Sequence, residues 1–142
     1  MKTPSLLPAF LIIVLSFSSC GTTEIIPVEK LAVNSWQLDY ISGTRIAFDG
    51  LYPGNVPEIS FNFNNSEISG STSCNSFSTK FTINGTQIDI SEEAVMTMMA
   101  CPGEGEQRFL DMLEKVDSYK FNEAGKLVFQ MDGVDVMRFS KK

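Results

Sequence analysis

Apolar and polar residues alternate along several short stretches of the chain. Trp36, Leu38 and Tyr40 are separated by the polar residues Gln37 and Asp39. A repeat of two residues is typical of a β-strand that buries one face. Similar patterns predict further short strands at residues 46–48, 59–63, 67–71, 77–83, 88–90, 119–121, 127–131 and 134–139.

Residue pairs that favour tight turns separate some of these strands. Asn84-Gly85 and Asp132-Gly133 are suited to the positive φ angles that a two-residue hairpin requires. The apolar segment 95–101 is also predicted to be extended, and its composition predicts a place in the core. The chain therefore has the pattern of many short antiparallel strands.

One helix is predicted late in the chain. Glu104 and Glu106 lie near its start, where the helix dipole favours acidic residues, and we interpret both as solvent-exposed. Four apolar residues recur at i, i+3, i+4 and i+7 and form one stripe: Phe109, Met112, Leu113 and Val116. The predicted fold class is mainly β with one helix (α+β).

The first residues have the composition of a secretory signal peptide. Lys2 precedes an apolar run over residues 6–17, which is too short to be read as a membrane-spanning helix. The residues that follow, Phe17-Ser18-Ser19-Cys20, resemble a bacterial lipobox. An ordinary signal peptide with an incidental cysteine is the alternative. We assign residues 1–19 to the signal peptide, 20–33 to a tether and 34–141 to the folded domain.

The lipobox resemblance implies lipidation of Cys20 and a location in the bacterial cell envelope. Acyl chains at this cysteine would anchor the protein stably, because each buried CH₂ group contributes about 0.8 kcal/mol. We therefore expect a membrane contact through the lipid at Cys20. The expected site is the outer membrane, with the domain facing the periplasm.

The charge and composition exclude several classes of function. The chain has 11 Lys and Arg residues against 17 Asp and Glu, a net charge of −6 and no histidine. The absence of a basic cluster argues against nucleic-acid binding. Without histidine, Ser73, Ser76 or Ser78 would need another base, such as Lys80, to act as a nucleophile. We predict no catalytic residue and no enzyme activity.

Two segments carry a family resemblance. Residues 70–78 read GSTSCNSFS, and residues 96–102 read MTMMACP. With Trp36-Gln37-Leu38 and the late helix, they make the chain similar to the META domain family. The motif residues are Gly70, Asn75, Phe77, Thr97 and Met98. From its residue type alone, Asn75 is interpreted as a turn residue that satisfies nearby backbone amides.

The resemblance implies both a fold and a setting. The fold is a strongly curved antiparallel sheet, partly barrel-like, with a helix packed on it. The setting is the bacterial envelope, in proteins linked to stress resistance, motility and secretion without an established enzymatic activity.

Cys74 and Cys101 are the two cysteines that remain after lipidation. In an exported protein they suggest one disulfide, although two buried free thiols are the alternative. Met96, Met98, Met99 and Cys101 also match the soft ligands that Cu(I) prefers. Methionine is equally suited to filling a core, and we expect no metal and no cofactor.

Three functional hypotheses follow. The first is a non-catalytic META-domain lipoprotein with a stress-related binding or structural role. The second is a periplasmic enzyme inhibitor that uses the loop at residues 49–56. The third is a carrier of a small apolar ligand, in a cavity lined by Phe61, Phe63 and Phe129. The expected partners are the membrane and an envelope protein or small ligand, with no nucleic acid.

Overall fold

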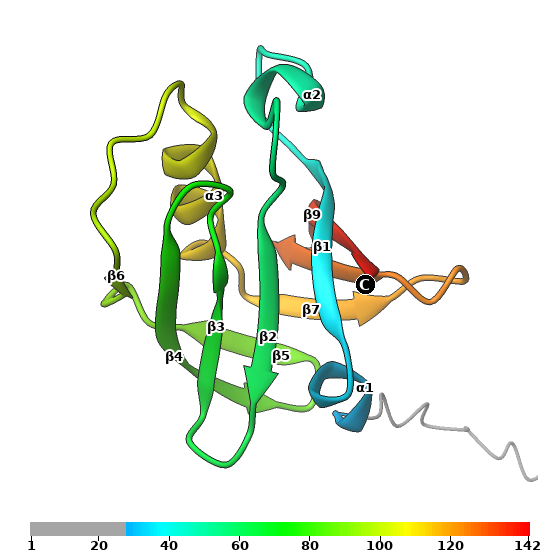
Figure 1. Ribbon diagram of the computed structural model, residues 1–142. Helices are drawn as coiled ribbons and strands as arrows, with labels where there is room; N and C mark the ends of the chain where they lie inside the picture. Colours follow the sequence, from blue (N-terminus) through cyan, green and yellow to red (C-terminus); the bar gives the residue numbers. More distant parts are fainter. Residues whose placement is uncertain (1–27) are drawn as a thin grey trace, which may run out of the picture.

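The strands close into a barrel (Figure 1). The computed structural model describes residues 28–142, so the signal peptide, Cys20 and most of the tether lie outside the described residues. Eight strands form the closed antiparallel barrel, and β6 pairs with β4 outside it. The strands are β1 (Ser35–Ile41), β2 (Glu58–Asn62), β3 (Glu67–Ser71), β4 (Ser76–Asn84), β5 (Gln87–Ile90), β6 (Val95–Met96), β7 (Ser118–Phe121), β8 (Leu127–Met131) and β9 (Val134–Lys141). The predicted fold class, a curved and barrel-like antiparallel sheet, is confirmed.

Closure depends on β3, which pairs with β2 on one side and with β4 on the other. At the centre of this pairing Gly70 lies opposite Ile59 and Phe77. A Cβ atom at residue 70 would lie 1.8 Å from the backbone carbonyl oxygen of Glu58. Because that neighbour is backbone, only glycine fits, and this is the physical reason for the first motif residue.

Side chains fill the barrel interior, as expected for eight strands. Phe61 packs edge-on against Phe81 with ring centroids 5.4 Å apart, and Phe63 lies 5.2 Å from the same ring. Phe129 packs on Phe139 at 5.2 Å. The three aromatic residues assigned to a ligand cavity are therefore packed against neighbouring rings.

The predicted helix is present as α3 (Gly105–Leu113). Phe109 and Leu113 are buried, Met112 is partly buried, and Val116 is buried just beyond the helix end. Phe109 packs on Phe77 of β4 with ring centroids 5.7 Å apart. The apolar stripe thus docks the helix on the barrel, and Phe77 is a core residue that receives it.

The strand predicted at residues 46–48 is wrong. Residues 42–47 form bends and turns, and Phe48 begins the short helix α2 (Phe48–Leu51). Phe48 and Tyr52, four residues apart, pack edge to face at 5.2 Å, a contact that favours a helical turn over a strand. The Tyr52 hydroxyl donates a hydrogen bond to the Gly105 carbonyl, which ties α2 to α3.

The end of the predicted tether is also folded. It contains α1 (Glu29–Ala32), whose Leu31 is fully buried. The Trp36 indole N–H donates a hydrogen bond to the Leu31 carbonyl at 3.2 Å. One helical turn is too short to show periodicity in the sequence. No helix within residues 28–142 is long and apolar enough to cross a membrane.

Candidate functional site

Buried polar side chains gather beside one surface segment. Among residues 28–142, the buried polar residues are Thr72, Asn75 and Thr79. All three lie on or next to the β3–β4 hairpin and bond to residues 91–106. We call residues 91–101 the methionine loop. A buried polar group is costly unless it is paired. Because all three buried polar side chains bond to this part of the chain, they fix the conformation of the loop.

Asn75 holds the centre of the loop. Its side-chain oxygen accepts hydrogen bonds from the Met99 backbone N–H and the Thr97 hydroxyl, both at 2.8 Å. Its amide nitrogen donates to the Met99 carbonyl at 3.1 Å. The side chain therefore pairs with both backbone groups of Met99, as a neighbouring strand would. The interpretation of Asn75 as a residue that satisfies local amides is wrong, because its side-chain partners lie more than twenty residues away along the chain.

Glu106 completes this network from the first turn of α3. It accepts hydrogen bonds from the Asn75 amide, with 3.0 Å to Oε2, and from the Thr72 hydroxyl. The prediction of a solvated Glu106 is therefore wrong. A glutamate in a first helical turn is ordinary in a sequence, and nothing in its pattern points to Asn75. Glu106, Thr72 and Thr79 are the residues of this site to which the sequence pattern did not point.

The two other anchors lie at the ends of the loop. The Thr79 hydroxyl donates to the Ser91 carbonyl at 2.7 Å. Cys74 and Cys101 form a disulfide with Cα atoms 5.9 Å apart. Because the Cys101 sulfur is bonded to Cys74, it is not a thiolate that could bind Cu(I). Within residues 28–142 no group of three or more His, Cys, Asp or Glu side chains could hold a metal ion.

The apolar side chains of the loop lie outside the core. Met98 is 95% exposed, Val95 77% and Met99 59%, whereas Met96 packs against the core. The prediction of an extended core segment is therefore wrong for most of these residues: only Val95 and Met96 form a strand, and of the two only Met96 packs against the core. The reason is that Asn75, Thr79 and the disulfide fix the backbone through polar and covalent bonds. These contacts hold the loop without burying Met98 or Met99.

A groove runs along the loop beside Asn75. It has a volume of about 500 Å³, within the range of ligand-binding pockets. Its lining combines buried network residues with exposed methionines: Asn75, Ala94, Met96, Thr97, Met98, Met99, Ala100 and Glu106. Thr97 accepts a hydrogen bond from the Ser76 backbone N–H, so the motif residues on both segments meet here.

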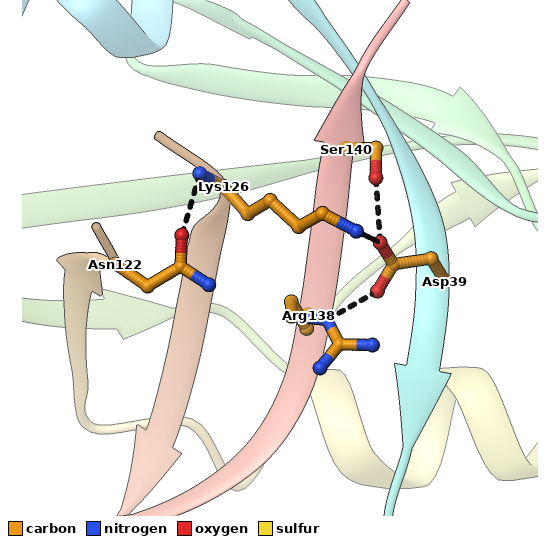
Figure 2. Close-up of polar contacts among 5 residues, drawn as sticks. All are labelled: Asp39, Asn122, Lys126, Arg138 and Ser140. Atoms are coloured by element: carbon orange, nitrogen blue, oxygen red, sulfur yellow. Dashed lines mark hydrogen bonds and ion pairs between the residues drawn. The ribbon is translucent and has the colours of Figure 1, made fainter. Parts of the chain in front are cut away.

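A second polar cluster lies on the barrel wall and centres on Asp39 (Figure 2). A β-bulge in β1 lies between Leu38 and Tyr40, and it shifts the inward alternation so that Tyr40 is exposed. The prediction that Tyr40 continues the buried face is therefore wrong. Asp39 accepts hydrogen bonds from Lys126, Ser140 and the Arg138 Nε, the last at 2.6 Å.

The contacts of the Asp39 cluster are those of a site that stabilises the fold. Burial alone would raise the pKa of the Asp39 carboxyl, but the hydrogen bonds from Lys126, Ser140 and Arg138 lower the pKa overall. A carboxylate held ionised by three donors is a poor general acid. The cluster ties β1 to β9 and to the turn before β8.

Lys80, the base that a serine nucleophile would need, has its contacts on the β2–β3 hairpin. Its ammonium group lies 3.0 Å from the Asn65 carbonyl and 3.4 Å from the Glu67 carboxylate. These contacts hold the lysine side chain against the β2–β3 turn. Lys80 therefore has no contact that would make it a base for a serine.

The fold and the clamped loop define a small β-barrel domain with one specified surface segment. The META domain family matches residues 29–142, and the chain belongs to this family. The match includes α1, and it confirms the resemblance carried by residues 70–78 and 96–102.

Two solved structures have the same fold. An NMR structure of a protein from Burkholderia xenovorans has a TM-score of 0.61 at 18% identity, with 99% of each chain covered. The crystal structure of a DUF4847 family protein from Bacteroides vulgatus has a TM-score of 0.56 at 13% identity, covering 79% of this chain and 94% of the other. No curated protein matches the chain significantly.

The Asp39 cluster should make stability depend on acid pH. The pKa of Asp39 lies below its ordinary value of 3.8, so its stabilising contribution is present above that pH. The contribution is lost as the pH falls through the folded-state pKa. Asp39→Asn should lower the free energy of unfolding by about 1–2 kcal/mol at neutral pH.

Urea denaturation from pH 7 down to about pH 2 measures this difference. The gap between wild type and Asp39→Asn should close at the acid end. Asp49→Asn, which removes an exposed carboxylate, is the control and should change little. A gap that stays constant down to the lowest pH would contradict the assignment.

The Cys74–Cys101 disulfide and the hydrogen bonds of Asn75 together form a clamp on the methionine loop. Both should contribute to the free energy of unfolding. Cys74→Ser and Cys101→Ser should each lower the free energy of unfolding by about 3–4 kcal/mol, as the chain-entropy model gives for a separation of 27 residues. The double variant should lose little more. Asn75→Ala should cost about 1–3 kcal/mol, because the backbone of Met99 loses its partner.

Thiol counting on denatured, unreduced protein checks the covalent part directly. Two free thiols in protein purified from the periplasm would refute the disulfide. Hydrogen exchange at the Met99 amide checks the polar part, and equal protection in wild type and Asn75→Ala would refute the clamp.

Proposed function

We propose that this META domain is a non-catalytic, lipid-anchored binding protein of the bacterial cell envelope with a stress-related role. The methionine loop is its contact surface. One observation carries the proposal: the buried polar side chains of the described chain hold a segment whose own apolar side chains face solvent. The disulfide adds a covalent restraint to the same segment.

The energetics favour a binding role for this loop. A hydrogen bond contributes only about 0.5–1.5 kcal/mol net, and the exposed side chains of Val95, Met98 and Met99 add little burial energy. Burial of the loop's own side chains therefore contributes little to holding it in place, and its hydrogen bonds and disulfide hold it instead. Fixing it in advance lowers the entropy lost on binding, and burying its apolar side chains against a partner then adds affinity.

The other two hypotheses have less support. In the loop at residues 49–56, Leu51 and Tyr52 are buried, which leaves Asp49, Gly50 and the tip around Gly54 as the exposed parts. That tip offers little apolar surface to an enzyme. The carrier hypothesis needs open space around Phe61 and Phe129, where aromatic rings are packed.

Lipid anchoring at Cys20 is compatible with a free methionine loop. Figure 1 shows α1 at the bottom of the barrel, whereas the chain between β6 and α3 runs along the upper left. The helix α1 and the segment between β6 and α3 therefore lie at different parts of the molecule. Under this proposal the anchor holds the domain near the membrane while the loop stays accessible.

The lipid anchor predicts a specific labelling result. Wild-type protein produced in bacteria should incorporate a radioactive or alkyne-tagged fatty acid, because Cys20 is acylated. Cys20→Ala should lose the label and stay uncleaved or be sorted wrongly. Cys74→Ala is the control, since its cysteine is in the folded domain. Equal label in wild type and Cys20→Ala would exclude the anchor.

If the methionine loop is the contact surface, the exposed methionines should determine how much of a bound partner is recovered. The double substitution Met98→Ser/Met99→Ser should reduce recovery of crosslinked envelope partners at least about tenfold, because each buried methionine contributes about 1.5–3 kcal/mol. Quantitative mass spectrometry after crosslinking in intact cells measures the recovery. The melting temperature should stay close to that of wild type.

Val134→Ser is the matched control for this substitution. Val134 is also an exposed apolar side chain, at 62% exposure, but it lies on the β8–β9 hairpin. Its substitution should leave the partners unchanged. If the methionine variant recovers the same partners at the same yield as wild type, the loop is not the contact surface.

A further inference from the structure

The charged side chains in the stretch of sequence that contains the methionine loop are all negative. Residues 81–107 contain no lysine and no arginine. Over the same range the acidic residues are Asp89, Glu92, Glu93, Glu104 and Glu106. The loop therefore combines exposed thioethers with nearby carboxylates and lacks a cation of its own.

Three carboxylates in or next to the groove-lining residues in sequence form no ion pair with a described lysine or arginine. Glu92 and Glu93 are exposed and directly precede Ala94, which lines the groove. Neither of them, nor Glu106, takes part in an ion pair formed within residues 28–142. The hydrogen-bond donors to Glu106 are the neutral groups of Thr72 and Asn75. Their negative charge is therefore available to a ligand.

We propose that the groove of the methionine loop binds a cationic amphipathic peptide segment, such as a stretch of a partner that carries lysine or arginine beside apolar side chains. This rests on the proposed function, since it names the chemistry of the partner at the same surface. The apolar side of the segment packs on Met96, Met98 and Met99. Its cations lie near Glu92, Glu93 and Glu106.

Both halves of this recognition follow from general physical chemistry. Methionine is unbranched and polarizable, so its side chain adapts to apolar groups of different shape. Charges of one sign beside a groove attract ligands of the opposite sign and repel those of the same sign. An acidic peptide is therefore excluded from this groove, and a cationic peptide is preferred over a neutral one.

Three peptides of equal length and equal leucine content test the preference. Their polar positions are all lysine, all glutamine or all glutamate. Binding to the purified mature lipoprotein in a neutral detergent is measured by calorimetry, with titration into detergent alone subtracted. The lysine peptide should bind about tenfold tighter than the glutamine peptide at low ionic strength, and the glutamate peptide should not bind. The advantage should shrink as ionic strength rises from about 0.01 M to about 0.15 M.

Charge variants locate the effect. Glu92→Gln/Glu93→Gln should weaken the lysine peptide about fivefold or more and leave the glutamine peptide unchanged. The matched control is Glu29→Gln/Glu123→Gln, which makes the same change in net charge at exposed positions outside residues 81–107. It should leave both affinities unchanged. An equal loss in the control would overturn the proposal, because it would show attraction to the overall charge only.

The methionine variant separates this inference from the function on which it rests. If the lysine and glutamine peptides bind equally and Met98→Ser/Met99→Ser weakens both, the apolar contact surface stands and the cationic preference is overturned. If Met98→Ser/Met99→Ser weakens neither peptide, the proposed contact surface itself fails. The inference is supported when the methionine and local charge variants both weaken the lysine peptide.

Discussion

Closure of the barrel through β3 and β4 is the constraint on which the rest of the structure depends. Gly70 permits it, since any side chain there would meet the β2 backbone. Once eight strands close, their edges are paired and their interior is filled by side chains. Neither a free barrel edge nor the packed interior is then a natural place for a ligand. If the domain binds a partner, as proposed, the segments outside the barrel are the ones that offer a contact surface.

The same hairpin that closes the barrel also organises the outside. Cys74, Asn75 and Thr79 lie at or near the start of β4 and reach three points of the methionine loop. Through these contacts the barrel fixes the conformation of a segment that buries little apolar surface itself. Such a segment would otherwise belong to the least stable part of the molecule. The clamp therefore contributes to the stability of the fold and also holds the loop in one position.

The sequence predicted the barrel strands well because alternation reports directly on which face is buried. It failed where a local irregularity or a distant partner decides the outcome. The bulge beside Asp39 turns Tyr40 outward, and no residue type in β1 predicts a bulge at this position. The composition of residues 95–101 indicated burial, but hydrogen bonds from Asn75 hold this segment at the surface. Asn75 is 24 residues from Met99 and 31 residues from Glu106 along the chain. Such separations carry no periodic signal.

A fixed backbone with adaptable side chains has a definite consequence for recognition. Asn75 and the disulfide determine where Met98 and Met99 are presented, so the position of a bound segment is specified. The thioether side chains can still rearrange around different apolar groups. If the loop binds partners as proposed, shape selects only weakly among them, and charge supplies most of the discrimination. In this proposal Glu92, Glu93 and Glu106, which form no ion pair within residues 28–142, provide it, because their charge disfavours acidic segments before any close contact forms.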